Sequence, residues 1–469
     1  MKGLNKHKIF IVFCFALAFI MLLALFTTQE LQPITSARIE DCQGRVEKLK
    51  TELEKLGTNY DEYIEDLQEG YEDNNLTDDE KNLIEQIKKY EGRITMLQNR
   101  EKCYGIAMIL VALFLVVGYV YQKICKANFT VPLVALCVLL SIGLSFRVII
   151  SFEIFDVIIL AISMVAMAIV FLVSRRILTM CDGMFYALMA SVILLLVANL
   201  IFAKEINGAK NWIYIGPVSV QPSEIIKFLL IMMGAHSYIS QRRVVAYYLT
   251  SLVSCMALLC FKDLGTAVVI FALMLMMTLL LLDNPKLFVT FLLVAVGALI
   301  CAFIMLGYVR ERFDNWGNAM ETPGGQQAQL IRSIIFGGFG GLGIENSTHI
   351  INIYSIDSDV IIGGITSVFG FGMLLIVMLC YSALVLVPRK NVAVYPWAYY
   401  ATTQFSVAIA IQALLNFLGS IDVLPFTGIV APFLSNGGSS SVAFFMIFGL
   451  VLASLHPKIV PLNKDADAV

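Results

Sequence analysis

The chain has 469 residues, of which 59% are hydrophobic and only 14% are charged. In soluble proteins about a quarter of the residues are charged, so this composition excludes a soluble enzyme and is typical of an integral membrane protein. The formal net charge of −2 favours no particular partner, and we expect no binding to nucleic acid.

Apolar runs long enough to cross a bilayer, which takes about 17 to 25 residues, recur along the chain. The first follows the basic start MKGLNKHK and resembles a signal peptide. It has no clear small-x-small cleavage site, so we predict an uncleaved span. Together the runs predict twelve membrane-spanning helices, near residues 8–27, 104–122, 131–149, 154–173, 184–203, 222–240, 244–261, 264–282, 286–307, 360–387, 397–418 and 430–455.

The first long polar segment, residues 28–103, holds 19 of the 35 acidic residues. Apolar residues follow a heptad spacing over 39–67 and again over 83–97. Because both ends of the segment enter the membrane, the two helices must run antiparallel. We predict an extracytoplasmic coiled-coil hairpin, whose second helix starts with a capping box formed by Thr77 and Glu80.

The predicted turn of this hairpin, near residue 72 or 73, brings Cys42 opposite Cys103 at its base. A disulfide between them is one expectation in an exported compartment, and two unpaired thiols are the other. A charged coiled coil is most often a spacer or a docking surface for another helical protein. Nothing in the hairpin indicates catalysis.

Lys and Arg concentrate in alternate short loops, which predicts that the N- and C-termini are both cytoplasmic. The outer side then receives residues 28–103, 204–221, 308–358 and the turn near 419–429. The residues that carry this bias are Lys2, Lys6, Lys8, Lys123, Lys126, Arg175, Arg176, Arg242, Arg243, Lys286, Arg389 and Lys390.

Polar groups gather where several spans meet the outer side, and such groups are costly in an apolar setting unless they have a function. Glu224 and Lys227 are three residues apart and share a helix face. A local ion pair that holds the bundle together is the alternative interpretation. Lys210 and Trp212 precede them in an outer loop, where they suit an anionic headgroup.

Three further polar sites lie on the same side of the membrane. Lys262 and Asp263 begin one span, and Asp359 stands at the edge of another. Residues 424–441, where a helix should start, are rich in prolines, glycines and hydroxyl residues. Irregular backbone at membrane depth is tolerated only where it lines a cavity or is buried in protein. We therefore predict one shared outer cavity.

These motifs, in this order, resemble the SEDS family of bacterial cell-wall synthesis, which includes FtsW, RodA and SpoVE. GAKNWIYIGPVSVQPSEIIKF is similar to the family's tryptophan loop and its Gln-Pro-Ser-Glu-x-x-Lys motif, and KDLGTA to its Pro-Asp-Leu-Gly-Thr motif. NFLGSIDVLPFTGIVAPFLSNGGSSS resembles its C-terminal signature. The resemblance covers roughly residues 130–457. The motif residues matched are Gln221, Pro222, Ser223, Asn416, Pro425, Thr427, Gly428, Pro432, Ser435, Gly437, Gly438, Ser439 and Ser440.

The resemblance implies an all-α polytopic membrane protein with a ten-span SEDS-like helical bundle in residues 128–469. Its large extracytoplasmic loop is residues 308–358. Residues 1–127 are then an added N-terminal module, which consists of span 8–27, the hairpin 28–103 and span 104–122.

The resemblance also implies a function, a glycosyltransferase that polymerises lipid II for cell shape, division or sporulation, with a class B penicillin-binding protein as its transpeptidase partner. Asp359 matches the family's essential carboxylate, which suits a general base. Glu224, Lys227, Trp212, Asp263 and Gln329 are the expected supporting residues of the cavity. For the lipid pyrophosphate the candidates are Lys210, Arg310 and Arg312, with a divalent cation, Mg or Mn.

Some positions depart from the family pattern. Ser367 and Val368 stand where the family has two glutamates, Asn211 replaces a basic residue, and Lys262 replaces a proline. These changes and the added hairpin keep a second interpretation open, a non-catalytic scaffold or regulator of wall synthesis. A third is a transporter of a lipid-linked precursor, which would require polar groups at mid-membrane.

Overall fold

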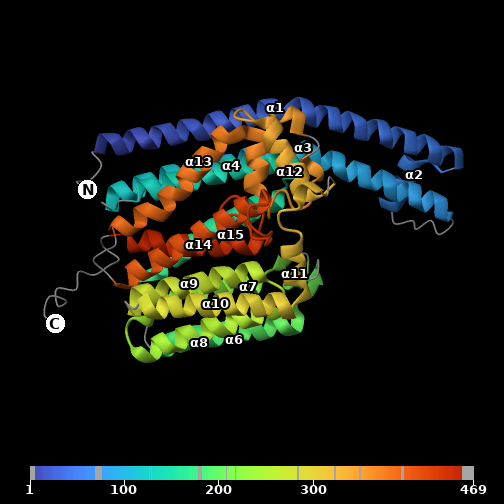
Figure 1. Cartoon of the computed structure of the whole chain (residues 1–469). Coiled ribbons are helices and arrows are strands. Elements are labelled where there is room, and N and C mark those ends of the chain that lie inside the picture. The colour runs from blue at the N-terminus through green and yellow to red at the C-terminus, as the bar shows by residue number, and fades with distance from the viewer. Residues whose placement is uncertain are drawn as a thin grey trace.

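Long helices that run side by side dominate the computed structural model of the chain (Figure 1). Two of them, α1 (Lys6–Leu56) and α3 (Asp78–Cys125), extend well beyond the others at one end. The structure describes residues 6–56, 58–68, 76–125, 127, 129–177, 182–206, 209–216, 218–282, 285–321, 324–347, 350–391 and 396–456.

Each of the twelve predicted apolar runs falls on a helix. Besides α1 and α3, these are α4 (Thr130–Ile150), α5 (Ile154–Ile177), α6 (Asp182–Phe202), α7 (Pro222–Ser237), α8 (Gln241–Cys260), α9 (Leu264–Leu282), α10 (Pro285–Met305), α13 (Ile361–Asn391), α14 (Pro396–Ser420) and α15 (Gly438–Ser454). Within the described residues, nine helices are long and apolar enough to cross a membrane, and α9 and α15 are apolar but shorter.

The last helix begins later than predicted, because residues 424–437 are irregular and α15 starts only at Gly438. α15 packs mainly on α5, α13 packs on α14 and α4, and α4 is buried among its neighbours for most of its length. The apolar runs thus form a bundle around α4 and α14, with α6, α8 and α10 towards the opposite edge from α1 (Figure 1).

The hairpin is formed by the outer parts of α1 and α3 and by a short helix, α2 (Tyr60–Gln68). Its core is a cluster of buried residues from all three helices: Val46, Leu53, Tyr60, Ile84 and Ile87. The predicted capping box is present, since the Thr77 N–H donates to Glu80 Oε2 at 2.8 Å and the Glu80 N–H donates to Thr77 Oγ1 at 3.4 Å. The predicted turn near residue 72 or 73 lies outside the described residues.

The two helices of the hairpin pair in a different register from the predicted one. Arg45 on α1 donates to the Tyr90 hydroxyl on α3 at 3.2 Å, and Cys42 lines a cavity together with Arg93. Cys42 therefore lies opposite a residue about ten positions before Cys103. Both cysteines are free and buried. Cys42 and Cys103 are thus the two unpaired thiols of the second expectation, and they are not joined by a disulfide. The register differs because the first arm is interrupted after Leu56, which the heptad pattern did not reveal.

A small antiparallel sheet departs from the all-α expectation. Its strands β1 (Lys204–Ile206), β2 (Ala209–Ile215) and β3 (Val218–Val220) lie in this order between α6 and α7. Gly216 has a φ of +63° in the turn between β2 and β3, a conformation that glycine adopts without steric cost. Trp212 pairs with Lys204 across the sheet, so the tryptophan loop is an ordered β-structure.

The loop 308–358, which the sequence predicts to be extracytoplasmic, also contains ordered elements. They are α11 (Gly307–Asp314), η1 (Ala319–Glu321), α12 (Gln326–Gly337), η2 (Glu345–Ser347) and η3 (Ile350–Asn352). The Gly-rich segment after α12 docks on a break in α13 at Gly370, whose φ is +81°. There the Leu342 and Gly343 N–H groups donate to the carbonyls of Ser367 and Val368 at 2.9 and 3.0 Å. The loop is therefore fixed against the bundle through its backbone.

Candidate active site

The polar sites predicted from the sequence converge on one cavity of about 550 Å³ at the end of the bundle from which the hairpin projects. Its walls come from β2 and β3, the first turn of α7, the start of α9, α11, the turn before α13 and the segment 426–440. The predicted residues that line it are Trp212, Gln221, Glu224, Lys227, Asp263, Arg312, Asp359, Thr427, Gly428, Gly437 and Ser440. One shared cavity was the prediction, and the lining residues agree with it.

Asp359 lies in a tight turn directly before α13, where its N–H donates to the Ser355 carbonyl at 3.1 Å. Its side chain faces Gly428, and a Cβ built on that glycine would lie 3.5 Å from Asp359 Oδ2. Burial raises the pKa of Asp359 to about 7, against the lowering effects of a hydrogen bond from Ser358 and of the Arg312 charge, while Asp357 raises it. A carboxyl group that titrates near neutral pH suits a general base.

The backbone around Asp359 is held by Asn416 on α14. The Asn416 amide donates to the carbonyls of Ser358, Asp359 and Ile429, at 3.2, 2.9 and 2.8 Å, and its oxygen accepts from the Ile362 N–H at 3.3 Å. Asn416 is 1% exposed. It therefore connects the Asp359 turn, the start of α13 and the irregular segment before α15, and acts as a positioning residue.

Ser435 fixes the same turn from the other side. Its hydroxyl donates to the Ser358 carbonyl at 2.7 Å and accepts from the Ala431 N–H at 2.8 Å. The Pro432 carbonyl accepts from the Tyr381 hydroxyl at 2.7 Å. The irregular segment that the resemblance singled out is thus a hydrogen-bonded frame for Asp359 that is partly buried and partly lines the cavity, as backbone at membrane depth requires.

Glu224 and Lys227 form an ion pair on α7, as the alternative interpretation held, with 2.7 Å between Lys227 Nζ and Glu224 Oε1, and both residues also line the cavity. Both are buried, and Lys227 also donates to Gln412 Oε1 at 3.2 Å. Glu224 Oε2 and Thr427 Oγ1 are buried with no hydrogen-bond partner among the described residues. Because buried polar atoms are nearly always paired, these two atoms of the cavity wall are suited to a polar substrate.

Asp263 has a structural role at the edge of the cavity, because its carboxylate connects the starts of α7 and α9. Its Oδ1 accepts from the Thr266 N–H at 3.0 Å and so caps α9, while Oδ2 accepts from Gln221 Nε2 and Ser223 Oγ at 3.3 and 3.2 Å. The carboxylate thereby ties the start of α9 to the start of α7, which Pro222 opens at the first helical position. Asp263 supports the cavity rather than offering free oxygens to it.

Of the three cationic residues predicted to bind a pyrophosphate, only Arg312 lines the cavity, and Lys210 and Arg310 do not. Arg312 lines the cavity, and its NH1 donates to the carbonyls of Phe426 and Thr427 at 3.3 and 3.2 Å. Lys210 instead donates to the Leu200 carbonyl near the end of α6, at 2.6 Å, and Arg310 donates to the Ile304 carbonyl at 2.8 Å. Neither of these two lines the cavity, since each caps the end of a neighbouring helix.

The remaining predicted residues complete the frame. Gln329 on α12 does not line the cavity, because its amide donates to the Gly324 carbonyl at 2.9 Å. Ser439 accepts from the Gln221 N–H at 3.2 Å. Pro425 lies in the irregular segment, and Gly438 opens α15.

One polar network next to the site was not identified from the sequence. The N–H and the side-chain amide of Asn436 donate to the carbonyl and to Oδ2 of Asp357, at 2.8 and 3.0 Å. Arg147 on α4 donates to Asn436 Oδ1 at 2.9 Å and pairs with Asp156 on α5. A charged residue inside an apolar run, Arg147, was the available signal for a buried ion pair.

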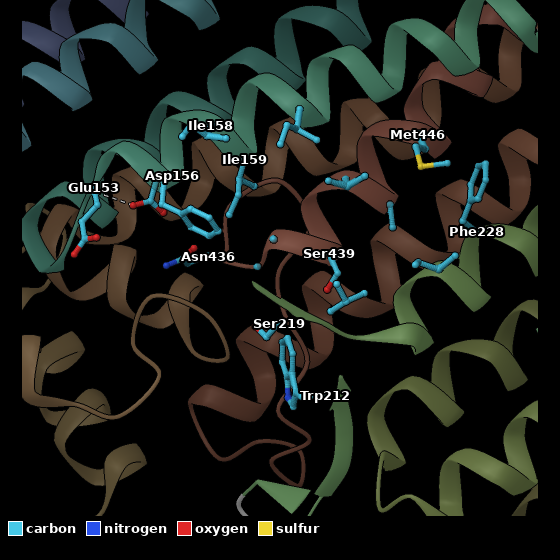
Figure 2. A pocket seen from close by; sticks show the side chains of 18 of the residues that line it. Glu153, Asp156, Ile158, Ile159, Trp212, Ser219, Phe228, Asn436, Ser439 and Met446 are labelled. Carbon is cyan, nitrogen blue, oxygen red and sulfur yellow. Dashed lines mark hydrogen bonds between the residues drawn. The ribbon is translucent and has the colours of Figure 1, made fainter. Parts of the chain in front are cut away.

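An apolar groove of about 750 Å³ adjoins the polar cavity, and the two share Trp212, Ser219, Asn436 and Gly437. Figure 2 shows it between the polar end at Glu153 and Asp156 and the apolar side chains of Phe228 and Met446. Its walls come from α5, α7 and α15. The site as a whole therefore suits an amphiphilic ligand.

The cavity residues do not fit a resident metal ion. Among the residues that the structure describes, no group of three His, Cys, Asp or Glu side chains lies close enough together to hold one, and both oxygens of Asp263 are used in the frame. The prediction of Mg or Mn thus rests only on the charge of the expected pyrophosphate.

The fold and the site define a multi-pass helical membrane protein with a carboxylate-containing cavity at one end of its bundle. Residues 150–458 match the family described as "Cell cycle protein", which comprises FtsW, RodA and SpoVE, and the chain belongs to this family.

Individual relatives agree with this assignment. A "Probable peptidoglycan glycosyltransferase FtsW" of Idiomarina loihiensis is 27% identical over 284 residues, 57% of this chain and 69% of the relative. Stage V sporulation protein E of Bacillus subtilis is 26% identical over 260 residues, 52% of this chain and 71% of the relative. A solved chain of a peptidoglycan synthase complex that coordinates polymerization and crosslinking shares the fold, with a TM-score of 0.56 at 24% identity, over 70% of this chain and 97% of that one.

Proposed function

We propose that this chain is a peptidoglycan glycosyltransferase that polymerises lipid II into glycan strands at the outer face of the bacterial cytoplasmic membrane. The observation that carries the proposal is the position of Asp359, a carboxyl group with a pKa near 7, in a polar cavity beside Arg312 that continues into an apolar groove. The names of the curated relatives support the same activity.

In the proposed reaction, the 4-hydroxyl oxygen of one sugar bonds to the anomeric carbon of another as the bond from that carbon to the lipid pyrophosphate breaks. Asp359 accepts the hydroxyl proton. Arg312 and Lys227 stabilise the negative charge that moves to the pyrophosphate. The polyprenyl tail lies in the apolar groove, with Trp212 and Ser219, which line both spaces, at their junction.

The orientation of the chain is part of the proposal. The basic loops predict cytoplasmic termini, and the cavity lies at the end of the bundle that bears the acidic hairpin (Figure 1). The cavity is then extracytoplasmic. We propose a class B penicillin-binding protein as the transpeptidase partner, and the hairpin as a surface for other division or elongation proteins.

The structure gives little support to the two alternative functions. Ser367 and Val368 are buried on α13 and do not line the cavity, so the lack of glutamates there leaves its lining intact, which weakens the case for a scaffold. The polar lining is gathered at one end of the bundle, whereas a transporter requires a polar path across the membrane.

The test is polymerisation of purified lipid II by the protein co-purified with its transpeptidase. Asp359→Asn should reduce the rate by roughly 10²- to 10⁴-fold. Asp314→Asn is the matched control, because Asp314 is exposed on α11, close to Arg312, but does not line the cavity. Equal rates in wild type and in folded Asp359→Asn would exclude Asp359 as the base. No product from wild type, with a known family member active in the same assay, would favour the scaffold.

A further inference from the structure

A second polar cavity, of about 340 Å³, lies at the base of the hairpin and shares no lining residue with the cavity around Asp359. It is bounded by α1, α3, the end of α4 with residues 151–153, and η3. The family match begins at residue 150. The walls from α1 and α3 therefore belong to the module that is additional to the family.

Four arginines line this cavity, Arg38 and Arg45 from α1 and Arg93 and Arg100 from α3, against only two carboxylates, Asp41 and Glu153. Arg45 is neutralised by Asp41, with 3.1 Å between Arg45 Nε and Asp41 Oδ2. Within the described part of the chain, no carboxylate lies within ion-pair distance of the other three guanidinium groups.

The remaining charges repel one another. Arg38 is close enough to interact unfavourably with both Arg93 and Arg100, and the favourable charge that acts on Arg100 is that of the adjacent Glu101. Like charges that share a partly buried space destabilise the fold unless a counter-charge enters it. The cavity therefore has an excess of positive charge that the described residues do not balance.

Arg100 shows most directly that the site is incomplete. It is only 4% exposed, its Nε donates to the Val148 carbonyl, and its NH2 group is buried with no hydrogen-bond partner among the described residues. Burying a charged donor without a partner is costly. An anion in the cavity would satisfy this donor.

We propose that this cavity binds a phosphate group through Arg38, Arg93 and Arg100, and that the group belongs to an anionic lipid or to a free phosphate ion. The planar fork of arginine donors matches phosphate oxygens. Arg100 lies one turn before the apolar segment of α3, which is the level of lipid headgroups. Leu97 and Phe152 provide an apolar wall beside the arginines.

The test measures retention of lipids by the full-length protein in native mass spectrometry, with phosphatidylglycerol and phosphatidylcholine as probes, and thermal stabilisation by inorganic phosphate. The variants are Arg93→Gln, at an exposed position, and Arg100→Gln, at the buried one. Lys81→Gln is the control, because it removes one charge from an exposed position on the same helix that does not line the cavity.

If the ligand is a lipid, phosphatidylglycerol binds in preference to phosphatidylcholine, and each arginine variant weakens its binding about tenfold, while Lys81→Gln does not. If the ligand is free phosphate, phosphate raises the melting temperature of wild type but not of Arg93→Gln, and the two lipids bind alike. Binding of neither probe, or equal binding by wild type and the folded Arg93→Gln protein, would overturn the proposal.

Discussion

Polar side chains differ in burial and in their partners between the hairpin and the cavity around Asp359. Along the hairpin arms most charged side chains are exposed, as in the contact between Arg45 and Asp41, one turn apart, and Arg100 at the base of the hairpin is a buried exception. Around the cavity, polar side chains are buried and join elements far apart in the sequence, as Asn416 joins α14 to the turn before α13. Exposed pairs contribute little to stability, whereas buried networks fix geometry. The cavity should therefore be sensitive to single substitutions, and the hairpin tolerant of them.

After substitution of Asp359 itself, the largest effect is expected at Arg312, the arginine that lines the cavity. Arg312→Gln removes the charge that we propose stabilises the leaving pyrophosphate, so kcat/KM for polymerisation should fall roughly 10²-fold. Arg310→Gln, on the same helix but bonded to the Ile304 carbonyl, should change kcat/KM less than about threefold. Equal losses in both variants would contradict the separation of the two arginines.

A comparable loss of activity, together with a loss of stability, is expected at Asn416, which positions the proposed base. Asn416→Ala removes the amide donor of the Asp359 and Ile429 carbonyls, while the Ser358 carbonyl keeps its hydrogen bond from Ser435. The loss should cost about 2 kcal/mol in the free energy of unfolding. Displacement of Asp359 by as little as ~1 Å should reduce kcat about 10²-fold. Gln329→Ala is the comparison, because the Gln329 amide donates to the Gly324 carbonyl and does not line the cavity. It should leave thermal stability and kcat nearly unchanged.

Gly428 tests how closely the cavity wall approaches the base. Its φ is +65°, and a Cβ there would meet Asp359 Oδ2. Gly428→Ala should therefore cost about 1–2 kcal/mol in backbone strain and reduce the polymerisation rate about tenfold. Gly297→Ala in α10, where no atom lies within 4 Å of an added Cβ, should be neutral or slightly stabilising. A fully active, equally stable Gly428→Ala protein would argue against this contact.

The smallest effect on activity is expected in the hairpin core. Leu53 is fully buried there, and Leu56, three residues later, is exposed. Leu53→Ala should weaken the hairpin by about 2–5 kcal/mol, measured by hydrogen exchange of α1 and α3. Leu56→Ala should not. Polymerisation by the isolated synthase should be unchanged in both, and a loss in Leu53→Ala would show that the hairpin contributes to the reaction.

The same contrast explains what the sequence could predict. Apolar length identifies the spans, and the three-residue spacing of Glu224 and Lys227 identifies their ion pair, because both are local properties. The motif around Asn416 was matched by resemblance, but its four hydrogen bonds depend on the packing of α13 against α14. The link from Arg147 to Asn436 joins residues 289 positions apart, so no local pattern contains it.

The structure departs from the sequence predictions where a local contact or a short element, which the sequence pattern does not reveal, determines the position of a residue. Lys210 and Arg310 have the right charge for a pyrophosphate, yet each side chain bonds to a carbonyl of an adjacent helix end. The sheet of β1 to β3 was missed because its outer strands have only three residues each. The interruption of α1 after Leu56 shifted the hairpin register, so Cys42 does not meet Cys103.

The central claim, that Asp359 accepts a proton from the sugar, is tested most directly by the pH dependence of kcat/KM in three proteins. A base must be deprotonated, so the wild-type rate should rise with pH through an apparent pKa near 7. Arg312→Gln removes a charge that lowers the pKa of Asp359, and should move the midpoint up. Asp357→Asn removes a negative charge that raises the pKa of Asp359, so the midpoint should move down. A profile that is flat through neutral pH, or a midpoint that both variants leave in place, would contradict the account.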